Sequence, residues 1–86
     1  MFYYVYVISN PNGRWYTGYT SDLRKRFSQH ATGKSTYTKD RGPWELIYYE
    51  ACVHENDARS REQYLKSGMG KRYLKNRLRG FLSLTG

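Results

Sequence analysis

Glu62 is the acidic residue with the most unusual expected position. The residues that share one face of a helix expected from His54–Asp57 to about Ser67 are Ala58, Glu62, Leu65 and Met69. An unpaired buried charge is costly, so this carboxylate needs a cation, a metal or a hydrogen-bond network beside it. A salt bridge within the helix would also serve, with candidates Arg59, Arg61 and Lys66. Periodicity leaves both interpretations open.

Arg26 and His30 form a second group with helical spacing. They lie four residues apart, beside the apolar stripe of a helix expected over about 22–32. That stripe consists of Leu23, Phe27 and Ala31. Both polar side chains are therefore expected at the edge of the core. A solvated ion pair between Asp22 and Arg26 is the ordinary alternative for the arginine. A zinc site is not expected, because the sequence has no His and Cys cluster.

Tyr6 and Tyr16 come from an expected β-hairpin. Residues 2–8 are β-branched and aromatic, 9–13 hold turn residues, and 14–19 are the expected return strand. The two tyrosines flank the turn at similar distances, which predicts that they lie near one another on one face. A phenol has an ordinary pKa of about 10, and only a nearby cation such as Arg26 would lower it toward neutrality.

This set of side chains suits phosphodiester chemistry. A carboxylate can hold one divalent cation, and an arginine can stabilise a phosphorane-like transition state. A phenol or an imidazole can orient or deprotonate water. Other familiar chemistries are missing from the sequence: it has no phosphate-cradling glycine-rich loop and no Gly-x-Ser-x-Gly. Cys52 lies in a strand pattern and is expected to be a small core residue.

The remaining elements must position these side chains. A polar loop is expected over 34–43, a third strand over 44–53, and a third helix over about 71–82 after Gly68 and Gly70. The expected buried face of that helix is Leu74, Leu78, Phe81 and Leu82. The element order is β-β-α-β-α-α. Because three strands cannot bury both of their faces, the helices must pack on the sheet. The sequence therefore predicts an α/β (α+β) layered fold with residues 1–86 as a single domain.

Composition excludes several classes of protein. The chain has 86 residues, one Cys and no long apolar run, which excludes a membrane-spanning helix and a disulfide-stapled fold. Ten Tyr are too many for a disordered chain. The N-terminus does not resemble a signal peptide, so we expect a cytoplasmic protein with no membrane partner. A net charge of +8 predicts a polyanionic partner, with nucleic acid first.

The order and spacing of these motifs resemble the GIY-YIG nuclease superfamily. Tyr4-Val5-Tyr6 stands at the GIY element and Tyr16-Thr17-Gly18 at the YIG element, with Arg26 ten residues after Tyr16 and Glu62 on a later helix. The nearest resemblance is to small single-domain bacterial GIY-YIG proteins related to the N-terminal domain of excinuclease C. It covers nearly the whole chain.

The resemblance implies a three-stranded antiparallel sheet flanked by helices and metal-dependent hydrolysis of DNA phosphodiester bonds. It implies a base or water-orienting role for Tyr6, with Tyr16 beside it. Arg26 would stabilise the transition state, and His30 would lie close to the scissile phosphate. Glu62 would bind a single Mg²⁺ or Mn²⁺. Gly18 would allow a close backbone approach, and Asn76 is the nearest candidate for a family asparagine.

DNA would be held mainly through its phosphates, with a role in repair or recombination. The expected nucleic-acid-binding residues are Gly18, Arg24, Lys25, Lys34, Lys39, Arg41, Lys71, Arg72 and Asn76. Backbone contacts of this kind predict weak sequence preference and strong salt dependence, so a protein partner is expected to supply specificity. The main alternative is a non-catalytic nucleic-acid-binding module that acts with such a partner. A basic protein associated with RNA is a third interpretation, which depends on charge alone.

Overall fold

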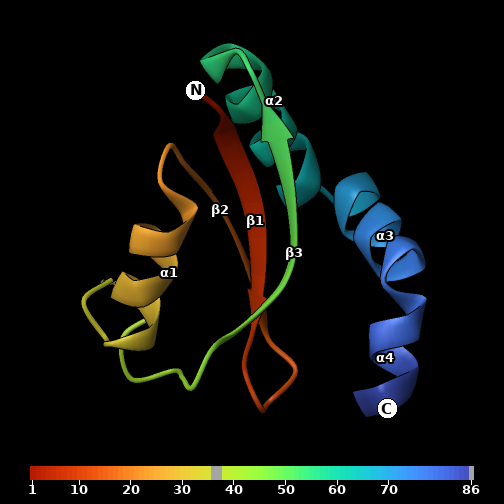
Figure 1. The fold of residues 1–86 in the computed structure, drawn as a ribbon. Helices are drawn as coiled ribbons and strands as arrows, with labels where there is room; N and C mark the ends of the chain where they lie inside the picture. Colours follow the sequence, from red (N-terminus) through yellow and green to blue (C-terminus); the bar gives the residue numbers. More distant parts are fainter. Residues whose placement is uncertain (36–37, 86) are drawn as a thin grey trace.

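The central element of the fold is an antiparallel sheet. The computed structural model describes residues 1–35 and 38–85. Within them, β1 (Tyr3–Ser9), β2 (Trp15–Thr20) and β3 (Glu45–Cys52) form a three-stranded sheet in the order β2-β1-β3 (Figure 1). The predicted sheet is therefore confirmed. The strand boundaries differ from the expected ones by about one residue at each end.

The β1–β2 turn fixes the register that the candidate site depends on. The Asn10 side chain accepts hydrogen bonds from the backbone N–H groups of Asn12 (3.1 Å) and Arg14 (2.9 Å). Gly13 adopts a φ of 80°, a left-handed conformation that favours glycine. The resulting pairing places Tyr6 opposite Gly18. Alternate residues of β1 then point to opposite faces of the sheet.

Helices cover both faces of this sheet. On one face, α1 (Leu23–Ala31) packs over the cluster of Tyr6, Ile8 and Trp44. On the other, α2 (Glu55–Lys66) and α3 (Gly68–Arg77) pack over Val5 and Val7 (Figure 1). The buried helical residues of this second cluster are Ala58, Leu65 and Leu74. The chain is thus layered as predicted. No helix within 1–35 and 38–85 is both long enough and apolar enough to cross a membrane.

Two expectations about the helical faces are wrong. Ala31 is exposed at the end of α1, and Met69 is 71% exposed. Met69 does not continue the face of α2, because that helix ends at Lys66 and Ser67 caps a new one. The Ser67 hydroxyl accepts a hydrogen bond from the Gly70 N–H at 3.1 Å. This cap turns the chain before Met69 can reach the sheet.

The expected helix over 71–82 is two helices. The first, α3, begins at Gly68, and α4 (Arg79–Thr85) follows after Leu78 caps α3. Of the expected buried face, only Leu74 is fully buried; Leu78, Phe81 and Leu82 are half-buried. Gly70 allows α3 to start tightly against α2, because a Cβ there would lie 2.5 Å from the Leu65 Cα. The break lets each short helix follow its own direction.

Candidate active site

Tyr6 lies at the centre of the sheet with its ring directed toward β2. The side chain is 1% exposed, and Gly18 stands opposite it. A Cβ on Gly18 would lie 2.5 Å from Tyr6 Cζ and still closer to the hydroxyl oxygen. The lack of a side chain at Gly18 therefore makes room for the Tyr6 phenol, while the predicted role of Gly18 in nucleic-acid binding stays a prediction. A larger residue at this position would push the phenol away from the β2 edge.

His30 is buried against Tyr6. The imidazole is 2% exposed, and its Nε2 shares a hydrogen bond of 2.7 Å with the Tyr6 hydroxyl. Its Nδ1 shares a second bond of 2.7 Å with the Thr38 hydroxyl. Thr38 is in turn held by Trp44, whose indole N–H donates to the Thr38 carbonyl at 3.0 Å. The loop after α1 therefore fixes the orientation of the imidazole ring.

Tyr16 completes a cluster of three rings. Its ring centroid lies 6.5 Å from that of Tyr6 and 5.2 Å from that of His30. Tyr16 pairs with Ile8 in the sheet, so it lies diagonally from Tyr6 on the same face. The structure thus brings both tyrosines and the histidine together.

Arg26 is held by polar side chains near this cluster. Its guanidinium donates to Gln29 Oε1 at 2.9 Å and to Ser35 Oγ at 3.2 Å. The alternative interpretation, an Asp22–Arg26 ion pair, is not found; Asp22 caps α1 and accepts a hydrogen bond from the Lys25 N–H at 3.1 Å. The arginine therefore keeps a positive charge that no carboxylate of α1 neutralises.

The environment keeps both hydrogen-bonded groups neutral. Burial raises the pKa of Tyr6 to about 12, and the Arg26 charge opposes this rise only in part. The expectation that Arg26 brings this pKa toward neutrality is therefore wrong, because desolvation is the larger effect. Burial, together with the smaller effect of the Arg26 charge, lowers the pKa of His30 to about 4. At neutral pH the pair consists of a phenol and a neutral imidazole.

Glu62 comes from α2, which packs on the opposite face of the sheet from α1. Its negative charge contributes to the raised pKa of Tyr6, so the carboxylate lies within electrostatic reach of the phenol. The side chain is 16% exposed and pairs with Lys66 Nζ at 3.1 Å. Of the three cations considered from the sequence, Lys66 is therefore the one that meets Glu62.

Glu62 is the candidate ligand for a divalent cation. Within 1–35 and 38–85, no group of three or more His, Cys, Asp or Glu residues could hold a metal. A site built from several such side chains is thus not present in this part of the chain. Mg²⁺ commonly binds one or two carboxylates, several waters and substrate phosphates, and a single partly exposed carboxylate suits that coordination.

Three of the predicted nucleic-acid-binding residues lie beside hollows of α3. Lys71 lines a cleft of about 330 Å³ together with Lys66 and three residues of β2, Trp15, Tyr16 and Thr17. Arg72 and Asn76 line a second hollow, of about 640 Å³, farther along α3. Since Tyr16 belongs to both the ring cluster and the Lys71 cleft, that cleft adjoins the candidate site.

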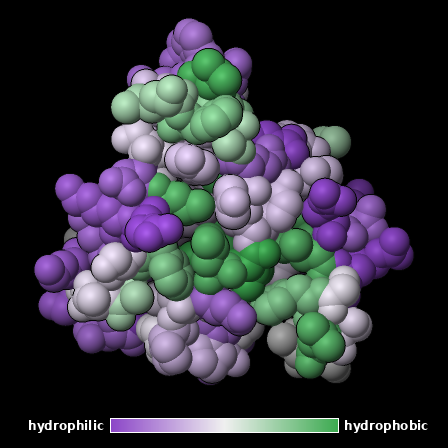
Figure 2. All heavy atoms as spheres, viewed as in Figure 1, coloured by the Kyte–Doolittle hydropathy of each residue, from purple (hydrophilic) through white to green (hydrophobic). Residues whose placement is uncertain are grey.

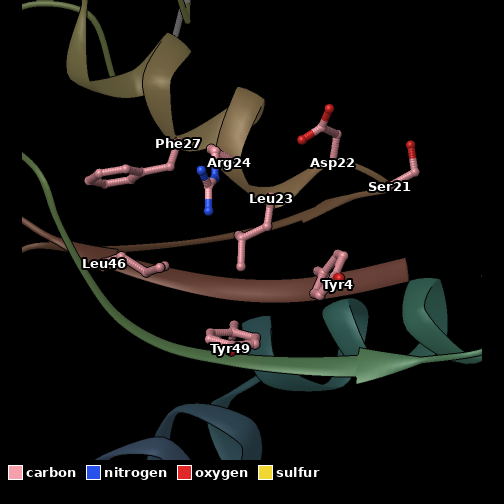
Figure 3. Close-up of a pocket in the computed structure, with 8 residues that line it drawn as sticks. All are labelled: Tyr4, Ser21, Asp22, Leu23, Arg24, Phe27, Leu46 and Tyr49. Atoms are coloured by element: carbon pink, nitrogen blue, oxygen red, sulfur yellow. The ribbon is translucent and has the colours of Figure 1, made fainter. Parts of the chain in front are cut away.

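The remaining predicted cations lie on or after α1. All five are exposed: Arg24, Lys25, Lys34, Lys39 and Arg41. Arg24 lines a different hollow, of about 500 Å³, between α1 and the β1–β3 side of the sheet (Figure 3). Its other lining residues include the exposed Tyr49 and the apolar side chains of Leu23 and Leu46. On the face of the molecule seen in Figure 2, hydrophobic side chains lie in the middle, with hydrophilic groups on either side.

Two residues of the site were not found by sequence reasoning. Thr38 is 1% exposed and Ser35 is 5% exposed, and they hold His30 and Arg26 respectively. Both lie in a polar loop whose composition gives no sign of burial. Their helical partners were recognisable by spacing, whereas these contacts depend on how the loop returns over α1.

Known proteins with similar sequences have similar size and fold. The family model described as the GIY-YIG catalytic domain matches residues 2–79. The UPF0213 protein BH0048 of Halalkalibacterium halodurans is 40% identical over 67 residues, covering 77% of this chain and 71% of that protein. The UPF0213 protein CPE1444 of Clostridium perfringens is 41% identical over 64 residues, which are 73% and 69% of the two chains.

A solved structure agrees with the fold described above. The solution NMR structure of the UPF0213 protein BH0048 from Bacillus halodurans matches with a TM-score of 0.56 and 38% identity. The match covers 88% of this chain and 84% of that one. The names of these relatives state no activity.

Proposed function

Since the chain belongs to the GIY-YIG catalytic domain family, we propose that it is a divalent-metal-dependent DNA endonuclease. The observation that supports this most is the buried hydrogen bond between Tyr6 and His30, with two opposite charges acting on the phenol. Those charges belong to Arg26 and Glu62, which come from helices on opposite faces of the sheet. A binding module has no need for an inward carboxylate beside a phosphate.

Tyr6 and His30 are proposed to activate the attacking water. The neutral imidazole can accept the phenol proton at Nε2 while the Tyr6 oxygen takes a proton from water. The hydroxide so formed attacks phosphorus, the bond to the leaving oxygen breaks, and that oxygen takes up a proton from solvent. An anionic phosphodiester nearby favours the imidazolium that forms on His30. Tyr16 packs against His30 and limits the orientations of that ring.

Arg26 is proposed to stabilise the charge that develops on the phosphate oxygens. Its side chain is held by Gln29 and Ser35, so little rearrangement is needed when the charge develops. A guanidinium also stays charged at every pH at which the protein is folded, and its planar donors match phosphate geometry.

Glu62 is proposed to hold the metal. A bound Mg²⁺ or Mn²⁺ supplies Lewis-acid stabilisation of the phosphate and its leaving oxygen. The protein's part is the position of the carboxylate, which α2 fixes from the far face of the sheet. The Glu62 carboxylate already has one cation beside it, the ammonium of Lys66 at 3.1 Å.

The basic residues are proposed to hold DNA through its backbone. Lys71 lies in the cleft next to Tyr16, and Arg72 and Asn76 extend the surface along α3. Lys25, Lys34, Lys39 and Arg41 extend it on the α1 side, and Arg24 lies in the Figure 3 hollow. Such contacts carry little sequence information. We therefore propose that a partner protein directs the enzyme to its DNA target. We also propose that it acts in DNA repair or recombination and is located in the cytoplasm.

Nicking of supercoiled plasmid DNA tests the proposal. Wild type is expected to nick in Mg²⁺ or Mn²⁺ and to be inactive in EDTA, while Arg26→Ala and Glu62→Ala lose nicking and keep DNA binding. Nicking that survives both substitutions would refute the assigned site. A wild-type protein that binds DNA without nicking, and binds as well or better after Glu62→Ala, would instead identify a non-catalytic binding module.

A further inference from the structure

Lys66 stands between the candidate metal ligand and a cleft that contains a second lysine. It is the last residue of α2, and its Nζ lies 3.1 Å from Glu62 Oε2. The same side chain lines the cleft of about 330 Å³ that also contains Tyr16 and Lys71. Tyr16 packs against the His30 ring at a centroid distance of 5.2 Å. One ammonium therefore touches the carboxylate and borders the surface next to the ring cluster.

The two partners in this ion pair differ in freedom to move. The Glu62 side chain is 16% exposed, whereas that of Lys66 is 45% exposed. A lysine carries its charge on a flexible four-carbon stem, and an ammonium can exchange one acceptor for another without a fixed geometry. A change of partner is thus more easily made by Lys66 than by Glu62.

A divalent cation and an ammonium would compete for this carboxylate. Both are positive, and like charges a few ångströms apart repel each other strongly in a partly buried setting. When Glu62 turns to a metal, Lys66 loses its counterion and has an alternative position within its own cleft. Lys71 already makes that cleft cationic, so an anion there would stabilise both lysines.

We propose that Lys66 is a mobile cation shared between Glu62 and the DNA backbone. In the metal-free protein it neutralises Glu62; with a metal on Glu62 it turns into the cleft and binds the phosphate next to the scissile one. This inference rests on the proposed function, because it requires Glu62 to bind the metal. It makes metal and DNA each strengthen the binding of the other, since such coupling is reciprocal.

The metal arm of the test uses Mn²⁺ and the full chain without DNA. Free Mn²⁺ is measured by electron paramagnetic resonance during titration of wild type, Lys66→Met, Lys71→Met and Glu62→Gln. Lys66→Met is expected to bind Mn²⁺ about two- to fivefold more tightly, because the competing ion pair is gone. Lys71→Met removes the same charge from the same cleft without touching that pair, so its Mn²⁺ affinity is expected to equal that of wild type.

The DNA arm measures fluorescence anisotropy with a phosphorothioate duplex that resists hydrolysis, over a range of salt concentrations. The salt slope is the steepness with which the logarithm of DNA affinity falls against the logarithm of salt concentration. In EDTA, Lys71→Met is expected to lower this slope by about 0.9, the value for one lost phosphate contact. Lys66→Met is expected to leave the slope in EDTA unchanged, because Lys66 is then tied to Glu62. In saturating Mn²⁺, both variants are expected to lose about 0.9 relative to wild type.

Each outcome points to one conclusion. Wild-type Mn²⁺ affinity in Lys66→Met, or a lower salt slope in EDTA for that variant, would overturn the shared-cation proposal. If Glu62→Gln binds Mn²⁺ as well as wild type, the metal site itself is wrong and the proposed function fails with it. Loss of Mn²⁺ binding in Glu62→Gln with no change in Lys66→Met would leave the proposed function standing and reject the role of Lys66 alone.

Discussion

Gly18→Ala is the smallest change expected to disable the site. The added Cβ would lie 2.5 Å from Tyr6 Cζ, whereas carbon atoms in contact prefer about 3.5–4.0 Å. The phenol must therefore move by about 1 Å, since the facing atoms of β2 are backbone. A shift of that size would disrupt the geometry of the 2.7 Å hydrogen bond to His30.

The cost of this change can be bounded. Overpacking of a buried site destabilises a protein by about 1–3 kcal/mol, and a displacement of about 1 Å at a reacting group can slow catalysis by about 100-fold. We expect Gly18→Ala to show both effects while it keeps the DNA affinity of wild type, because the basic surface is unchanged. Urea denaturation followed by circular dichroism gives the stability, and single-turnover cleavage gives the rate.

Gly80→Ala is the matched control for this experiment. Gly80 lies in α4, no atom lies within 4 Å of its Cβ position, and alanine is the better helix former. This variant is expected to keep wild-type activity and to gain up to about 1 kcal/mol in stability. If Gly18→Ala instead matched wild type in both stability and rate, the placement of the phenol against β2 would be wrong.

Three further changes test the surroundings of the site. Thr38→Val is expected to lower the cleavage rate about 10-fold at unchanged DNA affinity and to alter the ¹⁵N shifts of His30, while Thr38→Ser keeps both near wild type. The His30 pKa of about 4 lies below the ordinary 6.5, so between these two pH values the unfolded state binds more protons than the folded state. The urea concentration at the unfolding midpoint is therefore expected to fall as the pH is lowered from 6.5 to 4, and to fall less steeply in His30→Gln. Arg61→Met leaves the half-buried Glu50 without its bidentate partner and is expected to lower the free energy of unfolding by about 1–3 kcal/mol. Arg59 is exposed, so Arg59→Met is expected to leave the urea midpoint unchanged. A flat pH response in wild type, or equal midpoints for the two arginine variants, would contradict these assignments.

The local parts of the site could be predicted from the sequence. The hairpin brings Tyr6 and Tyr16 together because their strands are joined by a short turn with clear turn residues. Arg26 and His30 share a helix, so a spacing of four residues is enough to place them on neighbouring positions. In each case the two residues are close in sequence, and the periodicity of one hairpin or one helix is enough to predict their contact.

The long-range parts could not be predicted in this way. Thr38 is polar and lies in a polar loop, and it is buried only because the loop folds back over His30 and Trp44. Periodicity left three possible cations for Glu62. The structure pairs Glu62 with Lys66, whereas Arg61 reaches across to Glu50 of β3 and Arg59 pairs with Glu55. The sign of the Tyr6 pKa shift also depends on burial, which outweighs the nearby arginine.

The central claim is that Glu62 serves hydrolysis of DNA through a divalent cation. Its most direct test is the single-turnover cleavage rate in Mn²⁺ for wild type, Glu62→Gln and Glu55→Gln. The two substitutions each remove one negative charge from the same helix. Glu55 pairs with Arg59 and Tyr19 at the start of α2. We predict a loss of at least about 100-fold for Glu62→Gln and a wild-type rate for Glu55→Gln. Equal rates for Glu62→Gln and wild type would contradict the account.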